Sequence, residues 1–223
     1  MAEIIGENED NFKRSGKFQQ WLRRFDEKTA RIQSVEEGWS LWRGQNKDEL
    51  VFALLFVRCL DEEGRERRSV VFFRGNASAV FLVVKNRSTK EKYAVLVEQL
   101  RIPSGGKLLE IPAGSAEEND DPLERIVREV QEEVGLLISA RDFNFLGSYY
   151  FSPGACDEKI SLYSCEVVLC NKDIQKLEGS LTGTPGEHTK VRLYRLEGFG
   201  MLPIYDAKTI LAYELYRKGR KAK

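Results

Sequence analysis

The segment from Gly114 to Leu136 constrains the fold more than any other part of this 223-residue chain. Asp121 followed by Pro122 is typical of a helix N-cap and first helical residue. Gly135 stands where a helix commonly ends. Between these signals the apolar residues recur every three or four positions, on one face of a helix: Leu123, Ile126, Val127, Val130 and Val134. The segment therefore predicts an amphipathic helix anchored in a core.

Three glutamates, Glu129, Glu132 and Glu133, fall on the side of this helix opposite the apolar face. Like charges at this spacing repel by about 0.2–0.5 kcal/mol per pair on an isolated helix. One interpretation is an acidic face in contact with water, the usual meaning of a charge run. The other is a divalent-cation site, because Mg²⁺ and Mn²⁺ prefer clustered oxygen ligands. The preceding Pro112-Ala113-Gly114 can turn a backbone carbonyl toward the helix, which favours the cation site.

Composition narrows the possible functions. Lys plus Arg and Asp plus Glu each number 35, so the chain is formally neutral and has no global attraction to nucleic acid or anionic membrane. The apolar runs, such as Val51–Val57, are far shorter than the ~20 residues of a spanning helix. The first twenty residues lack the apolar core of a secretory signal, and the four cysteines form no C-x-x-C pair. We therefore expect a cytoplasmic protein with reduced, mostly buried thiols and no nucleic-acid or membrane partner.

The same segment resembles the Nudix box, G-x5-E-x7-R-E-U-x-E-E-x-G-U, where U is aliphatic. The matching residues are Gly114, Arg128, Glu129, Val130, Glu132, Glu133, Gly135 and Leu136. Asp120 replaces the first glutamate of the box, which keeps the charge on a shorter arm. In the family this position supports the loop and the box arginine, so we expect a modest change in geometry.

The likeness extends over residues 75–223 and implies the Nudix fold, an α+β architecture with an α/β/α sandwich around a mixed sheet. Further segments resemble the nucleoside-diphosphate-sugar branch, and within it the plant-type ADP-sugar pyrophosphatases. These segments are Gln99-Leu100-Arg101, Leu109-Glu110-Ile111-Pro112-Ala113-Gly114, Ser152-Pro153-Gly154, Gly186-Glu187 and Asp206-Ala207-Lys208-Thr209. The resemblance thus implies hydrolysis of an ADP-sugar to AMP and sugar phosphate.

The resemblance also implies Mg²⁺, or Mn²⁺, as the cofactor. Glu129, Glu133 and the Ala113 carbonyl would hold metal, with Glu132 as a further ligand, direct or through water, and a catalytic residue. Glu187 matches the residue that accepts a proton in this branch; the alternative is an ordinary loop carboxylate next to Pro185-Gly186.

Four residues are candidates for binding substrate. Arg101 resembles a contact to the phosphates or terminal sugar, with a surface arginine as the alternative, and Gly114 belongs to the box. Glu158 follows Ser152-Pro153-Gly154 and has Asp157 as a competitor. Lys208 resembles a substrate-facing lysine, and the alternative is a solvated helix start.

Two other functions stay open. The enzyme could prefer UDP- or GDP-sugars or dinucleoside polyphosphates, because base selectivity depends on a few pocket contacts. Alternatively, the chain could be a non-catalytic Nudix module that binds RNA or protein. The intact Glu129, Glu132 and Glu133 argue against the second possibility.

The N-terminal third has a different character. We expect a disordered tail over residues 1–16 and a small module over 17–74, with an antiparallel sheet and a helix of roughly four turns from Phe18 to Ile32. Strands are expected at Trp39–Trp42, Val51–Leu60 and Ser69–Phe73. Members of the resembled branch are usually dimers to which this region contributes, which implies a homodimer here.

Overall fold

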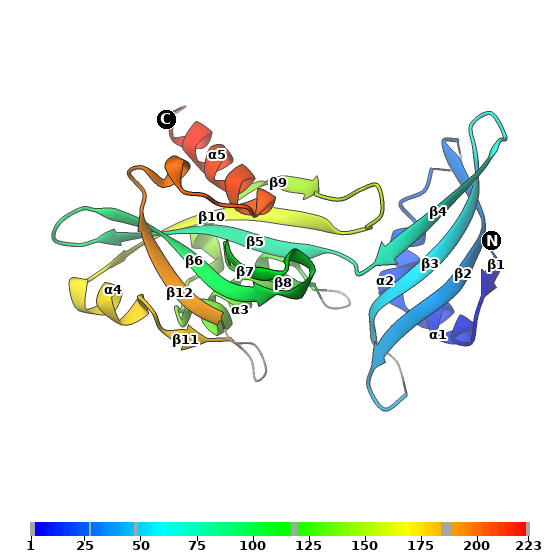
Figure 1. Ribbon diagram of the computed structural model, residues 1–223, viewed down its shortest axis with the longest axis horizontal. Coiled ribbons are helices and arrows are strands. Elements are labelled where there is room, and N and C mark those ends of the chain that lie inside the picture. Colours follow the sequence, from blue (N-terminus) through cyan, green and yellow to red (C-terminus); the bar gives the residue numbers. More distant parts are fainter. Residues whose placement is uncertain (1–2, 27, 47–48, 117–119, 184–188, 222–223) are drawn as a thin grey trace. The chain divides into compact units, whose positions relative to one another are not determined.

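A computed structural model describes residues 3–26, 28–46, 49–116, 120–183 and 189–221. The chain divides into two units, each with its own sheet (Figure 1). The N-terminal unit contains the described residues up to Asn76, with Ala116 and Tyr150–Lys159, and the larger unit contains the remainder.

The N-terminal unit is built on a sheet with the strand order β1-β2-β3-β4. Its elements are β1 (Glu3–Ile5), α1 (Glu9–Arg14), α2 (Gly16–Leu22), β2 (Ala30–Arg43), β3 (Glu49–Asp61) and β4 (Glu66–Phe73). β2, β3 and β4 pair antiparallel, whereas β1 joins β2 in parallel, so the sheet is not wholly antiparallel as predicted. The two helices and one sheet face enclose a core that includes Phe12, Phe18, Trp21, Leu55 and Phe73.

The predicted disordered tail is wrong for the described residues between Glu3 and Gly16. Phe12 is buried among the aromatic side chains of Phe18 and Trp42, with ring centroids 5.0 and 5.1 Å away. Glu37 on β2 accepts hydrogen bonds from the backbone and the side chain of Asn8 at 3.0 and 2.7 Å. One deeply packed ring and one carboxylate therefore order a segment that is otherwise polar.

The predicted four-turn helix is also wrong in length, because α2 ends at Leu22 and the chain from Ala30 is strand β2. The backbone turns at Asp26, whose carbonyl accepts the N–H groups of Thr29 and Ala30 at 2.9 Å. Ile32 fits a helical spacing from Trp21 by coincidence, and its β-branched side chain suits the strand that forms. The predicted strands of this region are confirmed.

The larger unit has a mixed sheet with the order β11-β12-β6-β5-β10-β9, to which β7 and β8 add by pairing with β6 and β5. β10 runs parallel to β5, whereas β6, β8 and β12 are in antiparallel pairs. The strands are β5 (Ala77–Asn86), β6 (Lys92–Arg101), β7 (Gly106–Glu110), β8 (Ala113–Ser115), β9 (Phe143–Tyr150), β10 (Lys159–Leu169), β11 (Leu181–Thr182) and β12 (Thr189–Arg195). The α-helices are α3 (Pro122–Val134), α4 (Asn171–Leu177) and α5 (Ala207–Lys221), and 3₁₀ turns cover Ile102–Ser104, Ala140–Asp142 and Phe199–Met201.

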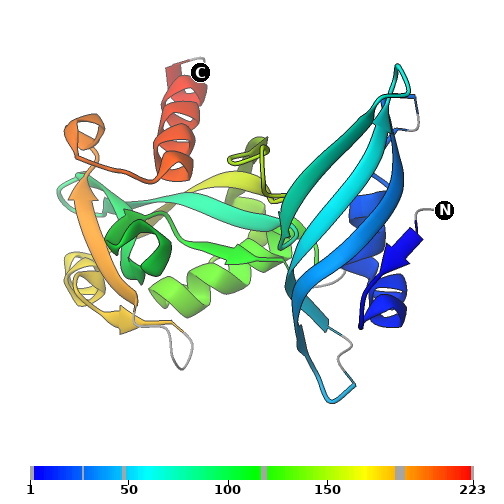
Figure 2. The same cartoon turned by 45° about the vertical axis from the view of Figure 1, so that its right-hand side comes forward.

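Alternation along β5 shows why this sheet is covered on both faces. Val80, Leu82 and Val84 share a core with the apolar residues of α3. The intervening Phe81 packs on the other face against Tyr213 and Tyr216 of α5, with ring centroids 5.6 and 5.1 Å apart. Figures 1 and 2 show α3 and α5 on opposite faces of the sheet. The predicted α+β class and α/β/α sandwich are confirmed.

Two further expectations concern cysteines and membranes. All four cysteines are free thiols, but only Cys165 is buried, and its burial raises the pKa of that thiol to about 12. Cys59, Cys156 and Cys170 are partly exposed, so the expectation of mostly buried thiols is wrong. Among the residues that the structure describes, no helix is both long and apolar enough to cross a membrane.

Candidate functional site

Helix α3 begins and ends where its sequence predicts. Asp121 Oδ1 accepts the backbone N–H groups of Leu123 and Glu124 at 2.8 and 3.1 Å. Gly135 follows the last helical residue with φ of 77°, a left-handed conformation that glycine adopts without strain. Its N–H donates to the Gln131 carbonyl at 3.0 Å. Local capping therefore sets the two ends of α3.

The three box glutamates do not share one environment. Glu129 and Glu133 are each only 5% exposed, whereas Glu132 lies on the exposed side of α3. Residues four apart stack on one helix face, so Glu129 and Glu133 form a buried pair of carboxylates. An acidic face in contact with water describes Glu132 but not this pair.

The loop before α3 lies directly against both buried carboxylates. Glu133 Oε2 accepts the Ala113 N–H at 3.0 Å. Gly114 is packed so closely on Glu129 that a Cβ built on it would lie 1.8 Å from Oε1. The loop itself is held by β8, which pairs with β5, and by the Val80 N–H, which donates to the Pro112 carbonyl at 3.0 Å. The predicted neighbours Ala113, Gly114, Glu129 and Glu133 are thus brought together.

Two arginines of α3 pair with carboxylates of the Nudix box. Arg125 forms an ion pair with Glu129 one turn away. Arg128 Nη2 contacts Asp120 Oδ2 at 2.7 Å, so the shorter aspartate still reaches the box arginine. The substitution at position 120 therefore preserves the contact expected of a glutamate there.

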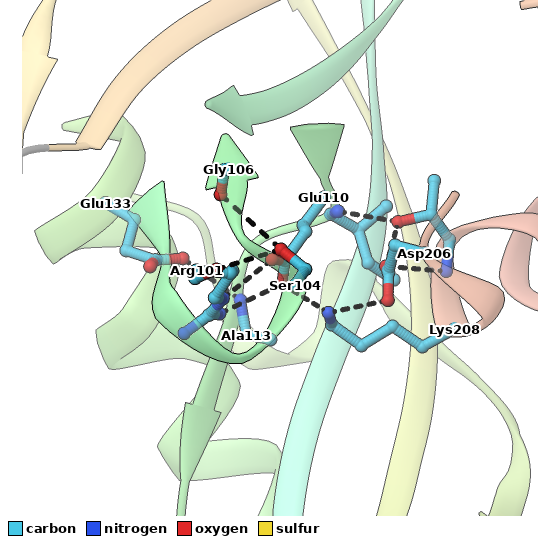
Figure 3. A network of polar contacts seen from close by, with 10 residues as sticks. Arg101, Ser104, Gly106, Glu110, Ala113, Glu133, Asp206 and Lys208 are labelled. Atoms are coloured by element: carbon cyan, nitrogen blue, oxygen red, sulfur yellow. Dashed lines mark hydrogen bonds and ion pairs between the residues drawn. The ribbon is translucent and has the colours of Figure 1, made fainter. Parts of the chain in front are cut away.

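A second cluster lies on the strand that leads into this loop, and Figure 3 shows it beside Ala113 and Glu133. Glu110, at the end of β7, accepts Arg101 Nε and Nη2 at 2.7 and 2.9 Å and Lys208 Nζ at 2.5 Å. Lys208 also contacts Asp206 Oδ1 at 3.0 Å. The structure therefore brings together Arg101 and Lys208, two predicted substrate contacts that are 107 residues apart in the chain.

The charges in this cluster shift its titrations. Burial acts to raise the pKa of Glu110, but the hydrogen bond from Arg101 and the charge of Lys208 outweigh it, and the pKa is lowered overall. The hydrogen bond to Glu110 in turn raises the pKa of Arg101. Glu110 is therefore ionised at neutral pH, although it is buried.

Glu110 is a site residue that sequence reasoning missed. The sequence does carry a signal, because one charged residue interrupts the otherwise apolar run Leu108–Ile111. Such a carboxylate is buried only when it is paired, and its partners here come from β6 and α5.

Two predicted residues, Glu158 and Glu187, are not part of these clusters as the structure describes them. Glu158 belongs to the N-terminal unit, where it pairs with Arg74 Nε at 3.1 Å. Its competitor Asp157 is buried and accepts the backbone N–H groups of Arg74 and Gly75 at 2.8 and 3.0 Å, a structural role. Glu187, the predicted proton acceptor, lies outside the described residues.

The comparison with protein families decides the affiliation of the chain. A family model described as the NUDIX domain matches residues 75–213, more than half of the sequence. The chain belongs to the Nudix family. The matched region includes α3 with its loop, Arg101, Glu110 and Lys208.

Curated relatives share this Nudix region. Nudix hydrolase 14, chloroplastic, of Arabidopsis thaliana is 34% identical over 172 residues, 72% of this chain and 55% of the relative. ADP-ribose pyrophosphatase of Bacillus subtilis (strain 168) is 29% identical over 130 residues, 56% of this chain and 66% of the relative. The chain therefore spans between about half and two thirds of the length of these relatives.

A solved structure confirms the Nudix fold. The crystal structure of an ADP compounds hydrolase aligns with a TM-score of 0.61 and 18% identity, covering 87% of this chain and 95% of the other. At that identity the likeness bears on the fold alone.

Nudix hydrolases generally use divalent metal ions, and the donors of this chain suit one. Glu129 and Glu133 supply carboxylate oxygens beside the backbone of Ala113 and Gly114. A side chain at position 114 would overlap the Glu129 carboxylate. No three acidic, histidine or cysteine side chains of the described segments gather into one cluster. Mg²⁺ fits such a set, because it is commonly bound by one or two carboxylates together with water and phosphate oxygens.

Proposed function

We propose that this chain hydrolyses the pyrophosphate bond of a nucleoside diphosphate sugar in a metal-dependent reaction. The substrate is an ADP-sugar, such as ADP-ribose or ADP-glucose, and the products are AMP and sugar phosphate. The observation that carries the proposal is the pair Glu129 and Glu133, buried side by side against Ala113 and Gly114 in a Nudix domain.

The residues divide the chemistry between them. Glu129, Glu133 and the Ala113 carbonyl would hold Mg²⁺ or Mn²⁺, and the exposed Glu132 would add a ligand through water. When bound, the ion would offset the diphosphate charge and lower the pKa of a coordinated water. Glu187 would accept the proton from the attacking water.

Substrate binding falls to groups near the metal carboxylates. Arg101 and Lys208 place two positive charges near Ala113, the residue before Gly114, where a phosphate could contact them (Figure 3). Glu158, a residue of the N-terminal unit, stays a predicted substrate contact.

The choice of an ADP-sugar rests on relatives. Proteins named ADP-ribose pyrophosphatase occur among them in Bacillus subtilis and in Haemophilus influenzae, the latter 34% identical over 105 residues. An assay of ADP-, UDP- and GDP-sugars with Mg²⁺ or Mn²⁺, read out as nucleoside monophosphate release, tests it. We expect AMP from an ADP-sugar as the fastest product, and no turnover across the panel would refute the activity.

The metal assignment has its own test. Glu133→Gln removes a ligand charge and should lower kcat by on the order of 100-fold or more, because the ion could no longer be held in place. Glu124→Gln, an exposed position in the first turn of the same helix, is the matched control and should retain activity. Equal activity in the two variants would remove Glu133 from the metal site.

We further propose a homodimer formed through the outer face of the N-terminal sheet. Trp39, Phe56, Val70 and Phe72 are all more than two fifths exposed on β2, β3 and β4. Aromatic side chains run across this face, with centroids of Trp39 and Phe52 5.7 Å apart and those of Phe52 and Phe72 5.8 Å apart. A second copy could cover such a patch through a self-complementary contact.

The cytoplasmic location expected from the sequence stays a prediction. The Arabidopsis relative carries the word chloroplastic in its name. Cell fractionation of the natural protein would decide between the two compartments.

A further inference from the structure

Glu110 uses both carboxylate oxygens to hold two cations from distant parts of the chain. Oε1 accepts Arg101 Nε, and Oε2 accepts Arg101 Nη2 and Lys208 Nζ (Figure 3). The Glu110 side chain is 3% exposed, whereas the side chain of Arg101 is 43% exposed. Both oxygens of this buried group are therefore occupied, Oε1 by Arg101 and Oε2 by Arg101 and Lys208.

The side-on contact fixes the plane of the Arg101 guanidinium. Nε and Nη2 face Glu110, and among the described residues no hydrogen bond uses Nη1. A guanidinium held at one edge presents its other donors in a fixed direction, which suits an anion with two acceptor oxygens. Lys208, only 11% exposed, adds a second charge at the same carboxylate.

The start of α5 makes the position of Lys208 equally definite. Asp206 Oδ2 accepts the Thr209 N–H at 3.1 Å and its hydroxyl at 2.5 Å. The same hydroxyl oxygen accepts the Ile111 N–H at 2.9 Å, which ties α5 to the end of β7. Ala113, two residues after Ile111, donates its N–H to Glu133, one of the proposed metal carboxylates. One short stretch thus connects the two-cation group with the proposed metal carboxylates.

We propose that Glu110 is a positioning residue that holds Arg101 and Lys208 as a two-cation clamp. The clamp would bind one phosphate group of the substrate diphosphate, the one whose charge the metal does not neutralise. This inference rests on the proposed function. Glu110 itself would not contact the substrate, and its contribution would pass through the guanidinium edge of Arg101.

The test is a double-mutant cycle on ADP-ribose hydrolysis with Mg²⁺. Glu110→Gln should raise KM on the order of tenfold or more, because it frees the guanidinium from a charged partner, with a much smaller change in kcat. Arg101→Lys keeps the charge but cannot form the two-donor contact, so it should raise KM similarly. In the double variant the two increases in KM should not multiply, because each single substitution already breaks the same Arg101–Glu110 contact. Unchanged KM in Glu110→Gln, or effects that multiply, would overturn the proposal.

The control is Glu166→Gln on β10. Like Glu110, the Glu166 carboxylate accepts hydrogen bonds from a lysine, Lys92, and from a second residue, Tyr216. This variant should leave KM unchanged even if it lowers the melting temperature to the same extent. If Glu110→Gln does not fold, Arg101→Lys still tests the proposal. An unchanged KM in that variant would contradict a clamp that depends on the two-donor contact of Arg101 with Glu110.

A binding measurement separates failure of the clamp from failure of the proposed function. Inorganic pyrophosphate is titrated without metal into the wild-type chain and into Glu110→Gln by calorimetry. If the wild-type chain hydrolyses no nucleotide sugar yet binds pyrophosphate on the order of tenfold more tightly than the variant, the clamp is supported and the activity is not. Equal binding, or none to the wild-type chain, would overturn the clamp.

Discussion

At the scale of single residues, Gly114 is under a constraint that arises from one contact. Its φ lies outside the left-handed region, so its backbone would accept a side chain. The space would not, because Oε1, Cδ and Cγ of Glu129 lie 1.8, 2.1 and 2.5 Å from the Cβ position. The glycine therefore serves the placement of a carboxylate rather than the geometry of a turn.

Gly114→Ala should consequently impair activity far more than stability. The methyl group must push the Glu129 carboxylate aside, and a displacement of about 1 Å at a reacting site can cost on the order of 100-fold in rate. The unfolding free energy should fall by only about 1–3 kcal/mol, as for other overpacked sites. Steady-state kinetics at varied Mg²⁺ and urea unfolding measure the two effects. Gly219→Ala is the control, because a Cβ at that position meets nothing within 4 Å. Normal kinetics for Gly114→Ala would contradict the close contact between Gly114 and Glu129.

At the scale of elements, the limits of a helix are predictable where the sequence carries several capping residues close together. The limits of α3 follow from Asp121, Pro122 and Gly135, whose effects act within one turn. The predicted helix from Phe18 to Ile32 had no such stop signal, and apolar spacing alone extended it into β2. Helix α1 went unpredicted because a single phenylalanine, Phe12, anchors a polar segment.

The candidate site divides in the same way. Glu129, Glu133, Ala113 and Gly114 were predictable because they lie within one motif. Glu110 was not, because its partners are nine and 98 residues away, and only the folded sheet and α5 bring them to it. Glu132 shows the limit of a helical wheel, since it shares a charge pattern with the buried pair but faces solvent.

Asp121→Ala tests how much the cap contributes to α3. The substitution leaves the N–H groups of Leu123 and Glu124 without their acceptor, and loss of an N-cap typically costs about 0.5–2 kcal/mol. Urea unfolding should show this loss, and Asp121→Asn should restore most of it. Activity should change little, because Glu129 and Glu133 lie two to three turns further along α3. A loss of activity as large as that of Glu133→Gln would contradict this division.

At the scale of the whole molecule, the N-terminal sheet has two faces of different character. Residues alternate along β3, so Ala53, Leu55 and Val57 enter the core beneath α1 and α2, and Phe56 points outward. On that outer face the Phe56 ring lies over Gly38, whose Cβ position is 2.6 Å from Cε2. Apolar side chains on the exposed face of a sheet lower solubility unless another surface covers them.

Charge placed on this outer face should therefore separate the proposed homodimer without unfolding the chain. Phe56→Glu combined with Phe72→Glu puts like charges in a self-complementary contact, where each charge would be buried without a partner. Light scattering after size-exclusion chromatography should give the dimer mass for the wild-type chain and the 25.6 kDa monomer mass for the variant. Phe145→Glu, at an exposed aromatic of the larger unit, should stay dimeric. A variant that keeps the dimer mass would place the interface elsewhere, because two buried, unpaired carboxylates per subunit cost more than this patch can offset.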